Sequence, residues 1–345
     1  MTLPIQPPYP PMEAEDAREI PSGANWQYEP KWDGFRCLAF RDGAEVQLQS
    51  KAGQLLARYF PEIVEAMAGL RARKFVLDGE IVIPAAAGLS FEDLLLRIHP
   101  AESRVQRLAR ETPGLYIAFD LLVDERGKLL TGLRLAERRS RLEAFAGQNF
   151  GEGQVRLSPA TPDLEKARVW LNDLGGGLDG LVAKRLDCDY RSGERGTGMV
   201  KIKFRRTADC VVGGFRYAQK EPVVGSLLLG LYDDAGLLHN VGFTSGIKAA
   251  DRPALTKRLE ALIEPPGFTG RAPGGPSRWA PGRTTDWKPL APKLVVEVEY
   301  DHFTGGRFRH GTRFVRWRPD KAPLQCTMRQ VEREAHSPIG LLKAS

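Results

Sequence analysis

Lys31 has the surroundings that a nucleophilic amine needs to attack a nucleotide phosphate. It stands two residues before Asp33-Gly34, with Glu29 two residues upstream and Arg36 five residues downstream. A primary amine attacks phosphorus only when it is unprotonated, so its pKa must be lowered by neighbouring cations or by burial. The K-x-D-G pattern is weak on its own, because a Lys-Trp-Asp-Gly string also fits a hairpin turn with a surface lysine.

Two further lysines supply cations for the same chemistry. Lys201 and Lys203 are two residues apart on a predicted strand, where such residues face the same way. Both ammonium groups can therefore converge on one phosphate, and with Arg36 they are the cations expected to lower the pKa of Lys31. Taken alone, a lysine pair of this kind is usually the solvated face of a strand.

Acidic and aromatic residues complete the predicted site. Glu80 and Asp179 each lie beside a glycine at a strand edge, where carboxylates can hold Mg²⁺ next to a polyphosphate. Acid–glycine pairs are mostly turns, however. Phe119 offers a ring that can stack on a base, although a single phenylalanine in an apolar strand is more often part of the core.

Length and composition indicate a two-domain protein of the cytoplasm. The 345 residues suit two domains, each large enough to bury a core without disulfides or metals. Lys plus Arg outnumber Asp plus Glu by 50 to 43, which permits a polyanionic partner without proving one. The four cysteines form no C-x-x-C pair and come without an N-terminal secretory segment, so we expect a reducing compartment. No apolar run approaches the length of a membrane span, and the five histidines show no zinc-ligand spacing.

The residues up to 207 predict an α+β domain with antiparallel sheets. The proline-rich first dozen residues predict an extended arm, and regular structure is expected to begin near Trp26. Hydrophobic periodicity predicts strands at residues 35–40, 45–49, 75–83, 116–123, 180–184 and 200–204. Helices are expected at residues 61–72, 91–98 and 135–145. No βαβ rhythm runs through this order.

The residues beyond Thr207 predict a smaller β-domain. Short strands are expected at residues 210–217, 226–232, 237–243, 294–300 and 313–318, with a helix at 253–263 and a Pro- and Gly-rich loop at 265–282. Five short strands with one helix suit a closed barrel of the oligonucleotide-binding type, and a β-domain of another topology remains open. We place the boundary between Arg205 and Asp209, which gives domains of residues 1–207 and 208–345.

Several runs occur together and in one order, and they resemble those of ATP-dependent DNA ligases of the covalent nucleotidyltransferase superfamily. The runs are Glu29 to Arg36, Asp78-Gly79-Glu80, Phe119-Asp120, Asp179 to Lys184, Lys201 to Lys203 and Arg318-Pro319-Asp320-Lys321. The segment from Tyr300 to Lys321 is especially similar to the short bacterial LigC-type enzymes. The resemblance covers nearly the whole chain and implies a nucleotidyltransferase (adenylation) domain followed by an oligonucleotide-binding-fold domain.

The resemblance also implies a role for each residue of these runs. Lys31 attacks the α-phosphate of ATP, expels pyrophosphate and carries AMP on its amine. Glu29 accepts a hydrogen bond from the adenine amino group, and Phe119 stacks on the base. Lys201 and Lys203 hold the α-phosphate and its developing charge.

The remaining implied roles concern the ribose, the other phosphates and the metal. Arg36 and Glu80 contact the ribose or phosphate side, with Lys184 in the same nucleotide-binding set. Glu80 and Asp179 lie near Mg²⁺ or Mn²⁺. On the second domain, Arg318 and Lys321 orient the leaving pyrophosphate. AMP then passes to the 5′-phosphate of a nick, where the adjacent 3′-hydroxyl displaces it.

Two positions depart from the family pattern. Asp179 stands where many ligases have glutamate, a carboxylate one methylene longer, so the metal is expected at a different distance or through water. Lys51, in Ser50-Lys51-Ala52-Gly53, stands where arginine is common. Lysine keeps the charge but loses the planar fork that contacts a phosphate bidentately. Lys51 stays in the predicted nucleotide-binding set.

A nicked duplex must be held by sequence-independent contacts to its phosphates. We expect a monomer that binds nicked DNA weakly and in a salt-sensitive way. The candidate contacts lie on the charged helix and near the end of the barrel, although a charge run is usually a solvated face. They are Arg134, Arg138, Arg139, Arg141, Arg307, Arg309 and Arg313.

Three other functions remain open at this point. An RNA ligase shares the ATP step but joins RNA ends, and an RNA-capping nucleotidyltransferase charges itself with GTP. A basic nucleic-acid-binding protein with a catalytically inert pocket is the alternative outside the enzyme class. The terminal R-x-D-K run and the LigC-like segment favour DNA ligation, with a role in DNA repair.

Overall fold

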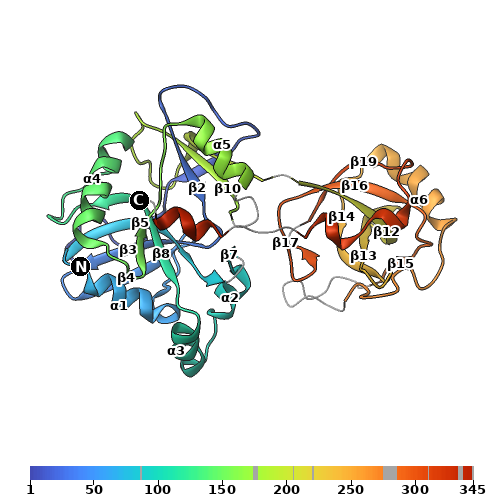
Figure 1. Ribbon diagram of the computed structural model, residues 1–345, viewed down its shortest axis with the longest axis horizontal. Coiled ribbons are helices and arrows are strands. Elements are labelled where there is room, and N and C mark those ends of the chain that lie inside the picture. The colour runs from blue at the N-terminus through green and yellow to red at the C-terminus, as the bar shows by residue number, and fades with distance from the viewer. Residues whose placement is uncertain are drawn as a thin grey trace. The chain divides into compact units, whose positions relative to one another are not determined.

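The computed structural model describes residues 1–85, 88–173, 178–204, 206–219, 221–274, 286–309, 311–332 and 337–343. It divides the chain into two compact units, Met1–Phe204 with Glu334–Ser345, and Arg205–Arg333 (Figure 1). Arg205 at the predicted boundary, His310 and residues 275–282 of the predicted loop lie outside the described residues.

The first unit contains a five-stranded sheet in the order β4-β3-β5-β8-β9. Its strands are β3 (Phe35–Asp42), β4 (Glu45–Ser50), β5 (Lys74–Val82), β8 (Leu115–Val123) and β9 (Val155–Leu157). All neighbours are antiparallel except β8 and β9, which are parallel. Four of these strands lie where the hydrophobic periodicity predicted them, and the short β9 was not predicted.

Both faces of this sheet are buried, because apolar residues occupy both sets of alternating positions on its strands. On one face Phe75 and Leu77 pack with α1 (Pro61–Gly69) and α4 (Leu135–Asn149). On the opposite face Val76 packs with Leu3 and Met12 of the N-terminal arm. The Phe75 and Phe145 rings meet edge to face with centroids 5.4 Å apart.

The N-terminal arm is therefore part of the fold, and the prediction that regular structure begins near Trp26 was wrong. Strand β1 (Glu13–Asp16) already pairs with β11 (Arg195–Lys203). The first dozen residues form no helix or strand, as the prolines predicted, but the second apolar face of the sheet needs a cover. Leu3 and Met12 provide it.

A four-stranded sheet, ordered β1-β11-β10-β2, forms the other half of the first unit. It adds β2 (Trp26–Lys31) and β10 (Gly180–Arg185) to the two strands above. Pro30 lacks a backbone N–H and is tolerated within β2 because this strand is at the edge of the sheet. One face packs on α5 (Leu164–Asp173) through residues such as Tyr28 and Leu181. The alternate residues of β2, β10 and β11 are left for the site.

Shorter elements complete the first unit. They are the strands β6 (Pro84–Ala85) and β7 (Gly88–Leu89), the helices α2 (Phe91–Leu96) and α3 (Glu102–Glu111), and the 3-10 helices η1 (Ala57–Tyr59) and η5 (Pro338–Lys343). The sequence did not predict α3, whose buried face is limited to Val105 and Ala109. It did not predict α5 either.

The second unit is a β-domain whose sheet runs β14-β13-β12-β16-β19, with β15 beside β12. The strands are β12 (Arg206–Tyr217), β13 (Val224–Tyr232), β14 (Leu238–Thr244), β15 (Lys288–Pro289), β16 (Val295–Tyr300) and β19 (Arg313–Trp317). A bridge between Thr244 and Thr312 connects the two ends of this order, as a closed barrel requires.

Smaller elements surround this barrel. They are α6 (Arg252–Glu260), the hairpin of β17 (Phe303–Thr304) and β18 (Arg307–Phe308), and the 3-10 turns η2 (Ala249–Asp251), η3 (Pro323–Gln325) and η4 (Met328–Gln330). The five predicted strands and the predicted helix are all present, so the α+β architecture with a terminal barrel is confirmed.

The second unit begins and ends earlier than the predicted domain of residues 208–345. It begins earlier because β12 already starts at Arg206. It ends earlier because η5 returns to the first unit, where Leu342 is buried against Trp32 and Ile117. Across the described ranges, no helix is both long and apolar enough to cross a membrane.

Arg97 and Glu62 form a buried ion pair that connects three helices of the first unit. The side chain of Arg97 is 0% exposed and lies 2.7 Å from the Glu62 carboxylate. Arg97 also donates to the carbonyls of Tyr59 and Thr112, while Glu62 accepts from the backbone N–H of Gly114. Removing one partner would leave the other charge buried without its counter-ion.

We predict that Arg97→Met lowers the free energy of unfolding by about 3–5 kcal/mol, measured by urea denaturation. Glu62→Gln in the same chain should recover part of this loss, because the amide keeps an acceptor for Gly114 without a buried charge. Arg107→Met on α3, whose exposed pair with Glu111 spans 3.7 Å, is the control and should change the stability by less than about 0.5 kcal/mol. Equal effects of the two arginine substitutions would contradict the prediction.

Candidate active site

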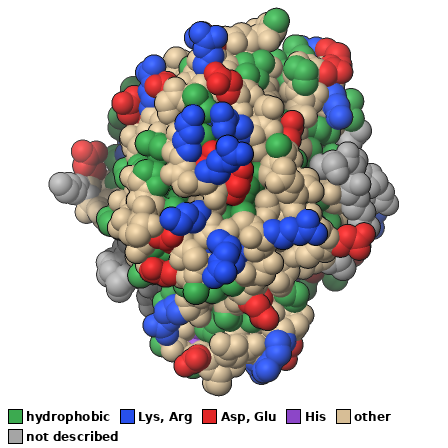
Figure 2. Space-filling view, turned by 90° about the vertical axis from the view of Figure 1, so that its left-hand side faces the viewer, with side chains coloured by type: hydrophobic (Ala, Val, Ile, Leu, Met, Phe, Trp, Pro, Cys, Tyr) green, Lys and Arg blue, Asp and Glu red, His purple; other side chains and the backbone are tan. Residues whose placement is uncertain are grey.

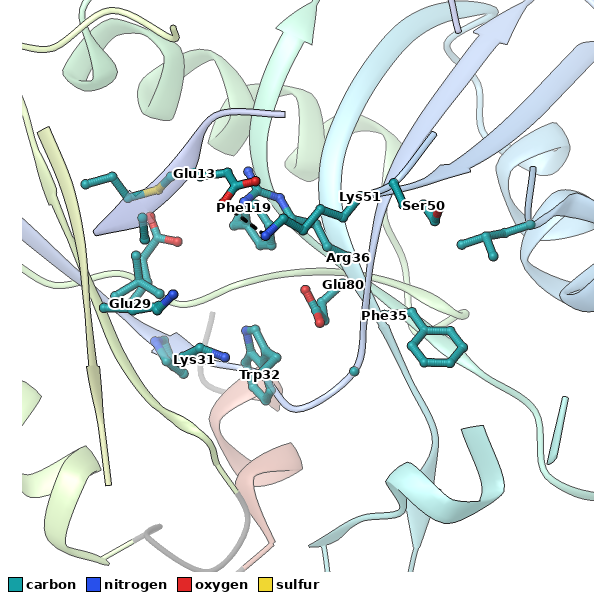
Figure 3. Close-up of a pocket in the computed structure, with 18 of the residues that line it drawn as sticks. Glu13, Glu29, Lys31, Trp32, Phe35, Arg36, Ser50, Lys51, Glu80 and Phe119 are labelled. Carbon is teal, nitrogen blue, oxygen red and sulfur yellow. Dashed lines mark ion pairs between the residues drawn. The ribbon is translucent and has the colours of Figure 1, made fainter. Parts of the chain in front are cut away.

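A cavity of about 810 Å³ lies between the two sheets of the first unit (Figure 3). Both sheets contribute side chains from alternate strand positions that face away from the apolar cores. Eight of the predicted site residues line it: Glu29, Lys31, Arg36, Lys51, Glu80, Phe119, Lys184 and Lys201. The structure thus brings together residues that are up to 172 positions apart in the sequence, from Glu29 to Lys201.

Lys31 is at the end of β2, where it pairs in register with Gly180 of β10. Its ammonium group forms an ion pair with Asp179, and the Asp179 backbone N–H donates to the Lys31 carbonyl at 2.9 Å. Gly180 has φ of +140°, and a Cβ there would collide with the Ile202 carbonyl. Only glycine therefore allows β10 to approach β11 at this point.

The electrostatic surroundings of Lys31 differ from the sequence prediction. Burial by itself lowers the pKa of the Lys31 amine, but the carboxylates of Asp179, Glu80 and Asp33 outweigh it, and the pKa lies above the ordinary lysine value. The prediction that neighbouring cations lower this pKa was wrong for the nucleotide-free protein. The reason is that carboxylates, rather than Arg36, Lys201 and Lys203, are the charges that act most strongly on the amine.

Burial disfavours the charged form of the Glu80 carboxyl group. Burial raises its pKa to about 8, although Lys31 and Arg36 pull it in the opposite direction. Strand β5 presents Glu80 to the cavity opposite Arg36 of β3. The glycine of the K-x-D-G run makes this close approach possible, because a Cβ at Gly34 would collide with the Ile81 carbonyl.

Arg36 is positioned by a buried acid that the sequence reasoning did not assign. Asp78 accepts two hydrogen bonds from the Arg36 guanidinium, at 3.0 and 2.7 Å. Asp78 also accepts from the Tyr190 hydroxyl at 2.7 Å, and that hydroxyl accepts from the Met12 backbone N–H at 3.1 Å. The available signal was the Asp78-Gly79-Glu80 run, in which only the glutamate was given a role.

Phe119 faces the cavity instead of the core, although its neighbours in β8 are buried. The Arg36 guanidinium lies 5.4 Å from the ring centroid and the Lys184 ammonium 4.7 Å from it. Lys184 also forms a 2.8 Å ion pair with Glu29, whose other oxygen accepts from Gln27. The two cations hold the ring and the carboxylate at one end of the cavity.

The other predicted cations of the first unit are Lys51, Lys201 and Lys203. Lys201 lines the cavity and pairs with Asp16 at 3.4 Å, and Lys51 pairs with Glu13 at 3.0 Å. Lys203 lies two positions beyond Lys201 on β11, opposite Gly180, and is not among the residues that line the cavity. The sequence reasoning missed Glu13, because it falls in a segment that was expected to have no regular structure.

Arg318 and Lys321 lie in the second unit, where both pair with Asp209 at 2.8 and 3.4 Å. Arg318 also binds its near neighbour Asp320. The R-x-D-K run thus forms one cluster of charges around a buried aspartate.

Two carboxyl groups could hold a divalent cation. Within the described ranges, no three or more His, Cys, Asp or Glu side chains gather into a metal-binding group. Glu80 and Asp179 both act on the Lys31 ammonium, and Mg²⁺ is commonly bound by one or two carboxylates together with substrate phosphates and water. The raised pKa of Glu80 fits this use, because a divalent cation would stabilise the charged form of that carboxyl group.

The predicted DNA-contacting arginines of α4 divide into two groups. Arg138 is buried and bound to Asp120 by two 2.9 Å hydrogen bonds, and Arg139 is buried and bound to Glu143 and the Ser158 carbonyl. Neither is available to a phosphate, so their assignment was wrong. Arg134 and Arg141 are exposed. Figure 2 shows Lys and Arg side chains spread over one face with Asp and Glu among them.

Comparison with known proteins identifies the family. The model of the ATP dependent DNA ligase domain matches residues 11–203, and that of the ATP dependent DNA ligase C terminal region matches residues 220–321. DNA ligase C2 of Mycolicibacterium smegmatis is 45% identical, with 98% of each chain covered. DNA ligase C of Mycobacterium tuberculosis is 42% identical, with 96% of each chain covered.

A solved structure of a Lig E DNA ligase superimposes with a TM-score of 0.55 and covers 90% of this chain and 99% of that one. At 19% identity this likeness supports the fold alone. The family models together span both units and most of the chain, and the resemblance seen in the motifs is confirmed. The chain belongs to the ATP-dependent DNA ligase family.

Proposed function

We propose that this chain seals nicks with 3′-hydroxyl and 5′-phosphate ends in duplex DNA, through an intermediate in which AMP is bonded to Lys31. The observation that carries this proposal is the place of the Lys31 amine, at the end of an edge strand and inside a cavity that is also lined by Phe119, Glu29 and Lys201. We further propose that it acts as a monomer in the cytoplasm, in DNA repair.

In the first step the Lys31 nitrogen attacks the α-phosphorus of ATP. A P–N bond forms, the bond from the α-phosphorus to the bridging oxygen breaks, and pyrophosphate leaves with the electron pair. Phe119 stacks on the adenine, and Glu29 accepts from the adenine amino group, since a carboxylate has lone pairs beyond those used by Lys184 and Gln27. Arg36 contacts the ribose or phosphate side, while Lys51, Lys201 and Lys203 stabilise the phosphate charge.

The amine must lose its proton before it attacks. Mg²⁺ or Mn²⁺ held by Glu80 and Asp179 would neutralise these carboxylates and part of the triphosphate charge. Burial, which lowers the pKa of Lys31, then acts without the opposing carboxylate charges. Activation of the nucleophile is in this way coupled to the arrival of the substrate.

Two further transfers complete the reaction. The 5′-phosphate of the nick attacks the phosphorus of Lys31-bound AMP and releases the lysine, and the adjacent 3′-hydroxyl then attacks the 5′-phosphorus and expels AMP. Arg318 and Lys321 serve the first step by orienting pyrophosphate. DNA is held through cations, for which the exposed Arg134, Arg141, Arg307 and Arg313 and the half-buried Arg309 are our candidates.

The covalent step is tested by exposing the protein to ATP or GTP with a divalent metal and measuring its mass. We expect one added AMP at position 31 with ATP, none with GTP, and none in Lys31→Ala. The labelled protein should then seal nicked DNA better than nicked RNA or hybrid substrates. Labelling by GTP would point to capping, preferential sealing of RNA to an RNA ligase, and absence of any adduct to an inert binder.

Asp179→Asn tests the electrostatic control of the nucleophile without any ligand. The substitution removes the largest of the carboxylate influences that raise the pKa of Lys31, while the burial that lowers this pKa remains. The pKa of Lys31 should therefore fall, and its modification by an amine-directed reagent should begin at lower pH. Peptide mass spectrometry over a pH series measures this, with Asp187→Asn as the exposed control. Identical profiles for Asp179→Asn and the wild type would refute the assignment.

Phe119→Ala tests base stacking. Loss of a stacked ring costs about 1–3 kcal/mol, so the KM for ATP in the labelling reaction should rise by roughly five- to hundredfold. Phe119→Tyr keeps the ring and should stay near the wild-type value, whereas Phe119→Leu keeps most of the volume and should resemble alanine. A leucine variant that binds ATP like the wild type would show that the ring acts only through its size.

A further inference from the structure

Glu13 bridges two cations at the rim of the cavity. Its carboxylate lies 3.0 Å from the Lys51 ammonium and also forms an ion pair with the Arg195 guanidinium. The three side chains come from three separate segments, namely β1, the turn after β4, and the start of β11. In Figure 3 a dashed line marks the Glu13–Lys51 pair among the side chains that line the cavity.

The arrangement is that of an anion held by two basic groups. Lys51 and Arg195 are each 53% exposed, whereas Glu13 is 26% exposed and lines the cavity. The hydrogen bonds from Arg195 and from Lys51 lower the pKa of Glu13, so the carboxylate is charged at neutral pH. Ion pairs between such exposed partners are weak, so another anion can replace Glu13.

A DNA phosphate is an anion that can take the place of the Glu13 carboxylate. A phosphodiester carries one negative charge, as Glu13 does, and its two non-bridging oxygens can accept hydrogen bonds from the guanidinium fork of Arg195 and the ammonium of Lys51. Each phosphate that a lysine or an arginine neutralises also releases condensed counterions, which favours binding of the DNA.

We propose that Lys51 and Arg195 form a phosphate clamp at the cavity rim and that Glu13 is its built-in competitor. The Glu13 carboxylate fills the clamp when no phosphate is present and must be displaced when a DNA phosphate enters. This inference rests on the proposed function, because it assumes that the cavity receives a nicked DNA strand after pyrophosphate has left and Lys51 no longer contacts ATP.

Such a competitor lowers the affinity of the clamp for every DNA phosphate, including those of the sealed product. Each displacement leaves the Glu13 carboxylate without its two partners, and this cost is subtracted from the affinity for DNA. The benefit is faster release of the product. Glu13 therefore favours turnover at the expense of binding strength.

Glu13→Gln tests the proposal in the full chain, with Glu15→Gln as the matched control. Glu15 is exposed, lies two residues further along β1 and carries the same charge. In Glu13→Gln the inhibition constant of intact duplex should fall about three- to tenfold, and binding should depend more steeply on salt, by about one unit of slope. Multiple-turnover sealing should slow more than single-turnover sealing. Glu15→Gln should behave like the wild type.

The pairing itself is tested by repeating Glu13→Gln in an Arg195→Gln background, where the substitution should have a much smaller effect. Weaker DNA binding by Glu13→Gln would mean that the glutamate only holds the cations in place, and this would overturn the proposal. So would equal behaviour of the two glutamine variants, or a change confined to the KM for ATP. If the wild type forms no AMP adduct and seals no nicks, the proposed function fails instead.

Discussion

The register between β2 and β10 is the constraint on which the site depends. It places Lys31 opposite Gly180 and so brings the amine against the carboxylate of Asp179. A shift of one residue would turn Lys31 towards the apolar face that packs on α5, because successive side chains of a strand point in opposite directions. The same alternation directs Glu29, Lys184 and Lys201 into the cavity. The pairing of β2 with β10 thus orients Glu29, Lys31 and Lys184 together.

The carboxylates that surround Lys31 favour the protonated form of its amine in the unliganded protein. The carboxylates around Lys31 raise its pKa, whereas burial acts in the opposite direction. At Glu80 burial disfavours the charged carboxylate and raises the pKa, whereas Lys31 and Arg36 lower it. A bound cation and a triphosphate would therefore change the pKa of both Lys31 and Glu80. Such coupling avoids a reactive free amine in the unliganded protein.

Residues outside the cavity hold its polar side chains in place through hydrogen bonds. Asp78 holds Arg36, Tyr190 holds Asp78, and the Met12 backbone holds Tyr190, so the N-terminal arm is connected to the site by a chain of hydrogen bonds. The arm also covers the second apolar face of the five-stranded sheet. Its two contributions, to the core and to the site, explain why a proline-rich segment without helix or strand is well packed.

The order of the chemical runs, most strands, the terminal barrel and the family could be predicted from the sequence, because strand periodicity and short motifs are local patterns. The sequence also identified eight residues that line the cavity. Four features could not be predicted in this way: the sign of the pKa shift at Lys31, the burial of Arg138 and Arg139, the packing of the arm and the bridging position of Glu13. Each of these depends on charges or apolar faces brought together from distant segments. A pKa reflects every charge and all the protein around a group, and no spacing along the chain records that sum.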